Sequence, residues 1–523
     1  MDAVSVLLAV GAVVIAIYYY IYRGFNYFKK HGIDHVKPTP IFGNIGEFVL
    51  RKKPLADLIK RTYYLNPEAK YVGFYEFSTP IIVLRDVDLI KRVAIKNMES
   101  FGEHRPFISL EVESIFRDML FVLGGNEWKD VRNKLTPVFT SSKIKGMFVL
   151  MTEIASRFAD YLTKLPEKER RELEMKTLLT KYTNDVIARC AFGINVDSIK
   201  DPNNAFYEHG NKATNFNTFL SITKVVLQRN MTTLAKLLNA RIVPKDSEEF
   251  FMNAIKDNMK YREENGIHQQ DIFQHLLDVQ KNNKTGMPFS TKSMINNAFS
   301  FYFGGYDSVA SQASLIMYNL LANPDCLTIL QQEIDKVLED TKGQVTYEAI
   351  SGMEYMDAVV NETMRLFPIA IFVDRICTND YELPPPVPGG KPFTIKKGTN
   401  LWIPSHAIQT DPKYYDNPDK FEPDRFIHDG KRILGSGTYM PFGVGPRMCI
   451  GNRFALAGIK VWIFYILARC DLKNCPKTQI PLKMSVNIMG NAAQDGYWMS
   501  VQPRKNRNQY ADNLIPNDTG NAE

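Results

Sequence analysis

The sequence predicts a mainly α-helical protein with small β-sheets, an α+β class, preceded by one N-terminal membrane-spanning helix. The longest helical pattern begins near Thr291 and stops at Asn323, before Pro324; it covers about thirty residues and roughly 45 Å. The strand-like pieces are short and bounded by Gly, Pro or Asp, and they cover residues 71–75, 81–84, 393–395 and 401–403. Long helices in excess over small, separate sheets indicate a helical body with minor β-structure.

Length and composition exclude several classes of protein. The chain has 523 residues, of which 45% are hydrophobic and 23% charged, so it can bury a large core and is neither disordered nor fibrous. Its 64 basic and 57 acidic residues leave a net charge of +7, which permits an acidic membrane or protein partner but is too scattered for a nucleic-acid binder. Six cysteines without a C-x-x-C pair exclude a disulfide scaffold and a cysteine-rich zinc module.

Residues 1–22 are expected to form a transmembrane anchor. From Ala3 to Tyr22 there is no charged residue, and a helix of twenty residues spans about 30 Å, the thickness of a hydrocarbon core. The nearest basic residue, Arg23, follows this run, and only Asp2 precedes it. This order favours an uncleaved anchor over a cleaved signal peptide and places the body of the chain in the cytosol.

The rest of the chain is expected to consist of a linker, one domain and a tail. Residues 23–45 are basic and rich in Pro and Gly, and because Pro restricts the backbone we expect a stiff linker. Residues 46–503 show no internal repeat and no break in composition, which indicates a single domain. Residues 504–523 are polar and rich in Asn and Asp, as is typical of a disordered tail.

The strongest chemical signal surrounds Cys449. The run from Pro441 to Gly451 holds three glycines and two prolines, so it forms a folded loop whose backbone can approach a flat ligand. The next stretch, from Asn452 to Cys470, is apolar nearly all round, as expected of a buried helix. A lone cysteine usually only packs. Here the pattern F-x-x-G-x-R-x-C-x-G is complete, and this favours a functional site.

The loop resembles the haem-binding loop of the cytochrome P450 family (haem-thiolate monooxygenases). The resemblance covers nearly the whole chain and is greatest to insect microsomal members of the detoxification type, with insect family nine as the narrower assignment. It implies the cytochrome P450 fold and haem b (iron protoporphyrin IX), with Cys449 as the axial thiolate and metal ligand. It also implies that Phe442, Gly443 and Gly451 lie beside the cofactor.

A second motif pairs Glu362 with Arg365, three residues apart on one helical face, ahead of a segment that contains Arg425. By itself such a pair is an ordinary surface contact. The resemblance implies instead that the three side chains form a buried network that supports the haem loop structurally.

A third motif consists of Trp128 and Arg132, one helical turn apart, with Asn126 as the expected N-cap. By itself it describes an ordinary amphipathic helix. The resemblance implies that Trp128 and Arg132 contact a haem propionate, that Arg447 contacts the second, and that Arg375 is a further candidate, since guanidinium suits a carboxylate.

The long predicted helix carries Gly304 and Gly305, followed by Asp307 and Ser308. Glycines inside a helix cost about 1 kcal/mol each relative to Ala, and close helix packing is the simplest explanation for them. The run resembles the family's oxygen-activation motif, which implies that Asp307 and Ser308 are catalytic. Ser308 replaces the usual threonine, and Val309 replaces a second hydroxyl residue. Serine lacks the methyl group that stiffens χ1, so we hypothesise that proton delivery leaks and releases hydrogen peroxide.

The resemblance implies insertion of one oxygen atom of O2 into small lipophilic substrates, with xenobiotics as the expected class. No G-x-G-x-x-G nucleotide fold is apparent, so NADPH is expected to act only indirectly, through NADPH–cytochrome P450 reductase, with cytochrome b5 as a second electron donor. The expected location is the endoplasmic reticulum membrane, with a single-pass anchor and a cytosolic catalytic domain. The charges expected to attract an acidic reductase are Lys129, Lys134, Lys431, Arg432 and Arg453.

By family position, the substrate pocket is expected to draw on Phe107, Phe216, Phe219, Phe301, Gly304, Gly305 and Phe372, although Phe is more often plain core. Residues 216–238 mix apolar and basic residues and are expected to contact the membrane interface. Two alternatives stay open. One is a biosynthetic hydroxylase of an endogenous steroid- or fatty-acid-like substrate; the other is a haem carrier or sensor, which would need no acid and hydroxyl in the long helix.

Overall fold

The computed structural model describes residues 11–12, 24–216, 218–269, 271–282, 289–486, 491–512 and 514–516. Within those ranges no helix is both long and apolar enough to cross a membrane. Except for Gly11 and Ala12, the predicted anchor at residues 1–22 lies outside the described residues. The anchor therefore stays a prediction.

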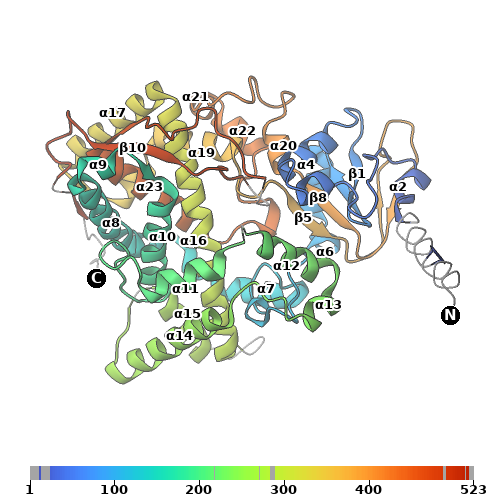
Figure 1. Ribbon diagram of the computed structural model, residues 1–523, viewed down its shortest axis with the longest axis horizontal. Coiled ribbons are helices and arrows are strands. Elements are labelled where there is room, and N and C mark those ends of the chain that lie inside the picture. Colours follow the sequence, from blue (N-terminus) through green and yellow to red (C-terminus); the bar gives the residue numbers. More distant parts are fainter. Residues whose placement is uncertain are drawn as a thin grey trace.

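Helices make up most of the fold, as the sequence predicts, and Figure 1 shows a large helical part beside a smaller part that holds the main sheet. The α-helices are α2 (Tyr27–Lys30), α3 (Gly46–Val49), α4 (Leu55–Tyr63), α5 (Val87–Lys91), α6 (Met98–Phe101), α7 (Gly125–Leu135), α8 (Ser141–Lys164), α9 (Glu167–Arg170), α10 (Met175–Ala191), α11 (Ala205–Thr214), α12 (Phe219–Asn230), α13 (Thr232–Leu237), α14 (Lys245–Asn265), α15 (Ile272–Asn282), α16 (Thr291–Ala322), α17 (Pro324–Thr341), α18 (Tyr347–Ser351), α19 (Glu354–Leu366), α20 (Ser405–Gln409), α21 (Asp424–His428), α22 (Gly430–Ser436) and α23 (Asn452–Arg469).

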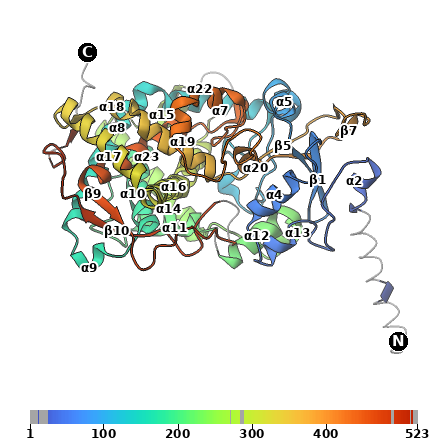
Figure 2. The same ribbon diagram turned by 90° about the horizontal axis from the view of Figure 1, so that it is seen from above.

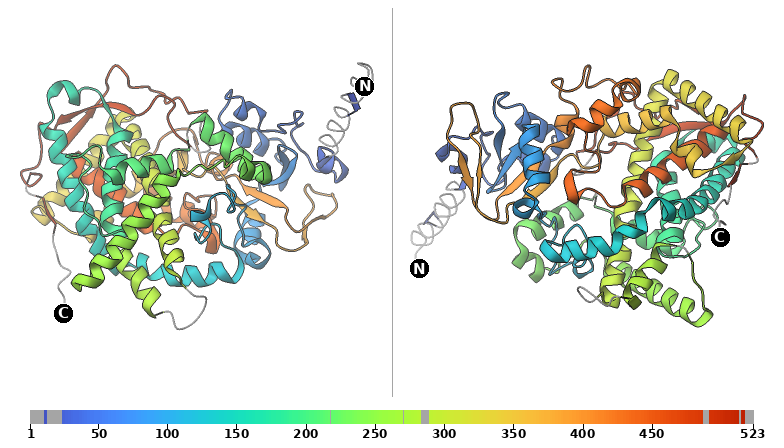
Figure 3. Two further views of the ribbon diagram at one scale, coloured as in Figure 1. Left: turned by 60° about the horizontal axis from the view of Figure 1, so that its bottom comes forward. Right: turned by 180° about the vertical axis from the view of Figure 1, so that it is seen from behind.

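The predicted long helix is α16, and it forms the centre of the helical part. Its N-terminus is capped by Ser290, whose side chain accepts a hydrogen bond from the Ser293 N–H at 3.0 Å. Most of its side chains are buried on every side, because α10, α14, α19 and α23 pack around it. Figure 2 shows α16 among α10, α14 and α23. In the rear view on the right of Figure 3, α8 lies alongside α23.

The strands form small separate sheets, and the largest has the order β1-β2-β8-β5. β1 and β2 are antiparallel, β2 and β8 parallel, and β8 and β5 antiparallel. The predicted strands are confirmed as β1, β2, β7 and β8, whereas the others were not predicted. The strands are β1 (Tyr71–Glu76), β2 (Thr79–Leu84), β3 (Leu173–Glu174), β4 (Gln344–Val345), β5 (Val373–Ile376), β6 (Tyr381–Leu383), β7 (Phe393–Ile395), β8 (Asn400–Ile403), β9 (Cys470–Lys473), β10 (Trp498–Pro503) and β11 (Ile515–Pro516).

Both faces of the four-stranded sheet are buried. Side chains alternate along a strand, so Tyr71 and Tyr75 join one apolar cluster while Val72 and Phe74 join the other. A strand buried on both faces reads as a nearly continuous apolar run. This explains why β1 and β2 could be predicted from the sequence.

Both ends of the described chain pack against the domain. In the expected linker, Phe28 is fully buried, and the Phe25 carbonyl accepts a hydrogen bond from the Tyr75 hydroxyl at 2.9 Å. In the expected tail, Arg504 binds both carboxylate oxygens of Asp335, at 2.8 and 2.6 Å. β11 then pairs with β4. Residues 504–512 and 514–516 are therefore held on the domain rather than free of it.

Candidate active site

The loop that carries Cys449 is folded back on itself just before α23. Gly443 and Gly445 have φ angles of 84° and 74°, a left-handed conformation that glycine adopts without strain. At Gly445 a Cβ would collide with the Ala94 carbonyl, so no larger residue fits there. The Cys449 N–H donates to the Phe442 carbonyl at 2.9 Å, which holds the two arms of the loop together. The loop therefore presents Cys449 on a rigid support.

The Cys449 side chain opens into a cavity, and protein surrounds it on its other sides. Burial raises the pKa of the Cys449 thiol, and neither the Gly451 N–H nor Arg132, which lower it, offsets that effect. A bound metal cation deprotonates a thiol outright, so the residue is suited to a metal ligand rather than a free thiolate.

The cavity has a volume of about 460 Å³ and lies between α16 and the Cys449 loop. Most of its lining is apolar. Isoleucine, phenylalanine and alanine side chains from several helices contribute to it. The predicted site residues that line it are Trp128, Arg132, Phe301, Gly304, Gly305, Ser308, Phe442, Gly443, Arg447, Cys449 and Gly451.

Three predicted arginines have no ion-pair partner among the described residues: Arg132 and Arg447 at one edge of the cavity, and Arg375 behind the Cys449 loop. Burial lowers the pKa of Arg375 to about 10. The pKa of Arg447 is also lowered to about 10, by burial and by the nearby charge of Arg375. Burial lowers the pKa of Arg132 as well. Among the described residues, no carboxylate lies within ion-pair distance of any of the three. Unpaired buried charge is costly. The edge is therefore suited to a ligand that carries more than one negative charge.

Hydrogen bonds of these arginines go to backbone carbonyls instead. Arg447 donates to the carbonyls of Gly102, Leu120 and Leu123, which uses three of its five N–H groups, and its guanidinium lies 4.2 Å from the centre of the Trp128 ring. Arg132 donates to the Met448 carbonyl at 2.9 Å.

Arg375 does not line the cavity; it donates to the carbonyls of Asp374 and Val444 at 2.7 and 2.9 Å. It thus fixes the Cys449 loop from behind. Arg132 and Arg447 retain free N–H groups at the cavity.

The α16 wall of the cavity is flat at the two glycines. A Cβ on Gly304 would meet nothing within 4 Å, whereas one on Gly305 would lie 3.0 Å from Ile187 Cδ1. Gly305 therefore serves close helix packing, and Gly304 leaves open space. One turn further, the Ser308 hydroxyl faces the cavity and donates to the Gly304 carbonyl at 2.5 Å. The free lone pairs of Ser308 Oγ can still accept a hydrogen bond from a molecule in the cavity.

Asp307 does not line the cavity. Its carboxylate is ion-paired with Lys176 of α10 at 2.8 Å and accepts a hydrogen bond from Ser311 at 3.3 Å. Neighbouring residues on a helix point about 100° apart, which is why Ser308 faces the cavity and Asp307 does not. The Asp307 side chain is 39% exposed and so connects with solvent.

The predicted pocket phenylalanines divide into three groups. Phe301 lines the cavity. Phe107 and Phe216 lie behind it, in contact with each other at a ring distance of 6.0 Å. Phe219 and Phe372 are corrections to the predicted pocket. Phe219 is 64% exposed at the start of α12, because that helix turns this face outward, and Phe372 stacks on Trp402 at 4.1 Å beside the sheet.

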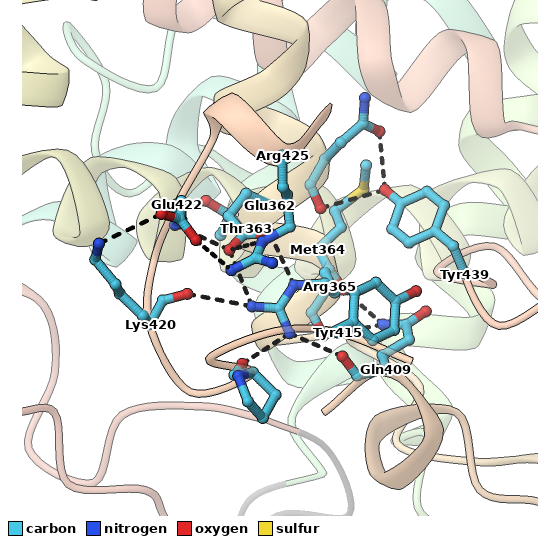
Figure 4. A network of polar contacts seen from close by, with 12 residues as sticks. Glu362, Thr363, Met364, Arg365, Gln409, Tyr415, Lys420, Glu422, Arg425 and Tyr439 are labelled. Atoms are coloured by element: carbon cyan, nitrogen blue, oxygen red, sulfur yellow. Dashed lines mark hydrogen bonds and ion pairs between the residues drawn. The ribbon is translucent and has the colours of Figure 1, made fainter. Parts of the chain in front are cut away.

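The Glu362 cluster contains the predicted side chains and is shown in Figure 4. Glu362 accepts from Arg365 at 2.7 and 2.9 Å and from Arg425 at 3.0 Å, and both Glu362 and Arg365 are fully buried. The remaining Arg365 donors bind the carbonyls of Gln409, Pro418 and Lys420. Every charge in this cluster therefore has its partner within the chain.

Gln409 connects the Glu362 cluster to the Cys449 loop. Its amide donates to the carbonyls of Met364 and Arg365, each at 3.0 Å, and its side-chain oxygen accepts from the Met440 N–H at 2.8 Å. Met440 directly precedes the loop at Pro441. The cluster thus supports the loop through one fixed amide.

Sequence reasoning missed three polar residues of the cavity, Ser300, Gln312 and His104. Gln312 is 4% exposed, lines the cavity one turn beyond Ser308, and its side-chain nitrogen has no partner among the described residues. The i,i+4 spacing from Ser308 could have identified it. His104 also lines the cavity, but its hydrogen-bond partner, Asp374, is 270 residues away in the chain. No local pattern could have identified His104.

The fold and the site together define a helical protein that places a cysteine sulfur and unpaired arginines around one apolar cavity, a class that binds a flat, anionic metal cofactor. Comparison with known proteins specifies that class. The family model described as Cytochrome P450 matches residues 35–496.

Similar proteins are insect members of cytochrome P450 families 9 and 6. Cytochrome P450 9e2 of Blattella germanica is 38% identical, covering 92% of this chain and 95% of the relative. Probable cytochrome P450 9f2 of Drosophila melanogaster is 35% identical, also over 92% and 95%. Cytochrome P450 6k1 of Blattella germanica is 33% identical over 94% and 95%. The chain belongs to the cytochrome P450 family and is a haem-thiolate monooxygenase, and its insect family-nine resemblance is confirmed.

Proposed function

We propose that this protein is a reductase-dependent monooxygenase that oxidises small lipophilic compounds, chiefly xenobiotics, at the endoplasmic reticulum membrane. The observation that carries the proposal is the arrangement of one cavity. Cys449 lies on one wall, Ser308 faces the same space, and the rest of the lining is mostly apolar. An apolar cavity with few polar groups takes its ligand through hydrophobic contact and imposes little hydrogen-bond selectivity.

The cofactor assigned to this cavity is haem b, and the residues present fit it. Cys449 would bind its iron, and Arg132, Arg447 and Trp128 would hold its carboxylates. Arg375 acts from behind the loop. Phe442, Gly443 and Gly451 line the cavity on the Cys449 side, where a planar group would rest. When bound, haem supplies the iron at which O2 is activated.

Proton supply is assigned to Ser308 and Asp307, which lie on different sides of α16. Ser308 Oγ faces the cavity and can hold a water molecule there by accepting its hydrogen. Asp307 is partly exposed, so its carboxylate contacts solvent, and it is ion-paired with Lys176. The two side chains are adjacent in sequence, and we assign to them jointly the supply of protons to the cavity.

Electrons are assigned to NADPH–cytochrome P450 reductase, with cytochrome b5 as a second donor. Lys129, Lys431 and Arg453 are exposed, as a docking face for an acidic protein requires. Lys134 and Arg432 are less suited. Lys134 is ion-paired with Asp130 at 2.7 Å and only 13% exposed, and Arg432 is ion-paired with Asp429 at 3.0 Å.

The membrane contact is assigned to α12 and α13, together with the predicted anchor. Large apolar side chains are exposed there, with Phe219 at 64%, Leu220 at 62% and Leu237 at 81%. Lys236 lies beside them, 48% exposed and ion-paired with Glu111. An exposed apolar helix face favours contact with a lipid interface. Figure 1 shows α12 and α13 below the strands β5 and β8 of the sheet.

The test is reconstitution of the full chain with NADPH and an NADPH–cytochrome P450 reductase in lipid vesicles. We expect product formation from several unrelated lipophilic compounds and none without reductase. A single tightly bound steroid- or fatty-acid-like substrate, with no turnover of the others, would instead establish the biosynthetic alternative. Haem binding without NADPH-dependent turnover of any compound would contradict both.

A further inference from the structure

Two pairs of polar side chains, each four residues apart, lie in the middle of α16. Asp307 and Ser311 do not line the cavity, and Lys176 of α10 bridges them. Its ammonium group lies 2.8 Å from the Asp307 carboxylate and donates to Ser311 Oγ at 2.6 Å. Ser308 and Gln312, each one residue further along, both line the cavity, and among the described residues no group bridges them. The first pair is complete within the chain, whereas the second is open to a molecule in the cavity.

Gln312 buries a hydrogen-bond donor that the rest of the described chain does not use. The residue is 4% exposed, and its Nε2 has no hydrogen-bond partner among the described residues. An amide N–H that is removed from water without a new partner costs free energy. Since most of the cavity lining is apolar, a molecule inside the cavity is the natural source of the missing acceptor. This favours a ligand contact over simple packing for Gln312.

Ser308 offers the complementary hydrogen-bonding function. Its hydroxyl hydrogen is donated to the Gly304 carbonyl, at 2.5 Å, so Oγ is left with lone pairs that accept. The amide nitrogen of Gln312 only donates. A ligand that satisfies both side chains must therefore donate to one and accept from the other. An O–H group, as in water or an alcohol, does both, whereas a carbonyl, an ether or a hydrocarbon does not.

Helix geometry brings the two side chains within reach of one such group. Residues four apart on a helix have Cβ atoms about 5–6 Å apart. Helical side chains lean toward the N-terminus of their helix, which for Gln312 is the direction of Ser308. An O–H···O bond of about 2.8 Å and an N–H···O bond of about 2.9 Å together span this separation. One oxygen atom can therefore contact both side chains.

We propose that Ser308 and Gln312 form a two-point binding site for one O–H group, which donates to Ser308 Oγ and accepts from Gln312 Nε2. The group comes from water or from the hydroxyl of a bound lipophilic compound. With water, Gln312 is a positioning residue for proton supply; with a compound, it selects hydroxylated substrates. The inference rests on the proposed function, in which Ser308 holds water, and adds a second residue that holds the same oxygen.

Gln312→Met tests the site, because methionine keeps the length of the side chain and removes the donor. The first measurement is an optical titration of the haem-loaded protein with pentylbenzene and with its terminal alcohol, which differ by one hydroxyl on a flexible chain. If that hydroxyl binds at the site, the dissociation constant of pentylbenzene divided by that of the alcohol should fall about fivefold in the variant, as for one lost hydrogen bond. Altered packing alone would weaken both compounds and leave this binding ratio unchanged.

The second measurement distinguishes water from a compound's hydroxyl. Pentylbenzene, which has no hydroxyl, is supplied as the substrate, and the initial rates of peroxide release and product formation are compared. If water occupies the site, the ratio of peroxide to product should rise about threefold to fivefold in Gln312→Met. Ser308→Ala should raise it too, and the two substitutions together should not add, because both release the same molecule.

Gln331→Met is the matched control. Gln331 is half-buried in α17, donates to Asp471 at 3.1 Å and does not line the cavity, so the variant should keep both wild-type ratios. In Gln312→Met, a changed binding ratio assigns the site to a compound's hydroxyl, and a changed peroxide ratio assigns it to water. Two unchanged ratios would overturn the proposal.

A wild type without NADPH-dependent turnover would contradict the proposed function instead. The site is then decided by the binding ratio together with a crystal structure of the haem-loaded protein. A water oxygen within about 3.2 Å of both Ser308 Oγ and Gln312 Nε2 would support it. No such oxygen, with an unchanged binding ratio, would overturn it.

Discussion

Two groups of arginines in this protein have opposite electrostatic surroundings. Arg365 and Arg425 share the carboxylate of Glu362, and the spare donors of Arg365 reach three carbonyls. Arg132 and Arg447 lie at the cavity, where the described chain offers carbonyls but no carboxylate. The first group is electrostatically complete, whereas the second needs an anion from outside the chain.

The difference separates a structural role from a binding role without reference to any relative. Breaking a complete buried ion cluster leaves an unpaired charge inside the protein, so folding should suffer. Removing a charge that has no partner within the chain should leave folding nearly unchanged and affect only the ligand. The substitutions below test that distinction, from the largest expected effect to the smallest.

The largest effect is expected for Glu362→Gln. It leaves Arg365 buried without a counter-charge and Arg425 with only the partly exposed Glu422, so the free energy of unfolding should fall by about 3–5 kcal/mol. Urea unfolding of the purified protein measures this change in the free energy of unfolding. If too little variant is recovered for that measurement, its yield of folded protein is compared with that of wild type. The control is Glu422→Gln, since Glu422 contacts Arg425 at 3.0 Å but is 36% exposed; it should cost less than about 1 kcal/mol. Equal stability of the two variants would contradict a structural role for the Glu362 cluster.

An intermediate effect is expected for Arg132→Leu. The variant loses one hydrogen bond to a carbonyl and one potential partner of a haem carboxylate. Unfolding of the haem-free protein should change by less than about 1 kcal/mol, whereas the dissociation constant for haem should rise about tenfold to a hundredfold. Lys129→Leu, on the exposed face of the same helix, should change neither. A large loss of stability with unchanged haem affinity would reverse the comparison.

The smallest effect concerns the opposite wall of the cavity, at Ser308. Ser308→Thr adds the methyl group that stiffens χ1, so a larger share of NADPH should yield product and a smaller share hydrogen peroxide, by at most about fivefold. NADPH consumed, peroxide released and product formed are measured together. Ser314→Ala removes a similar hydroxyl–carbonyl bond in α16 away from the cavity and should leave the ratio as it is. The same ratio in Ser308→Thr and wild type would eliminate the leak hypothesis.

The sequence predicted those parts of the molecule that depend on local pattern. α16 begins at the predicted Thr291 and α23 at the predicted Asn452, and β1 and β2 coincide with predicted apolar runs. The spacing of apolar residues and the Gly, Pro and capping residues that end an element are local properties of the sequence. At α7 the helix begins at Gly125, so the expected N-cap Asn126 lies inside it.

The misses concern the direction of side chains and contacts between distant segments. Asp307 and Ser308 are neighbours in sequence, but only the structure shows that they face different sides of α16. Phe219 was expected to line the substrate pocket and is exposed, because no pattern within α12 shows which of its faces is covered. His104 meets Asp374 across 270 residues, and spacing along the chain carries no information about such a contact.

The central claim is that Cys449 binds haem iron as a thiolate in the cavity that Arg132 and Arg447 border. The optical spectrum of the reduced protein with carbon monoxide tests it most directly. We predict the thiolate-type band in wild type and in Cys475→Ser, a half-buried cysteine away from the cavity, and its loss in Cys449→Ser. A haem-loaded wild type without that band, or a Cys449→Ser variant that keeps it, would contradict the account.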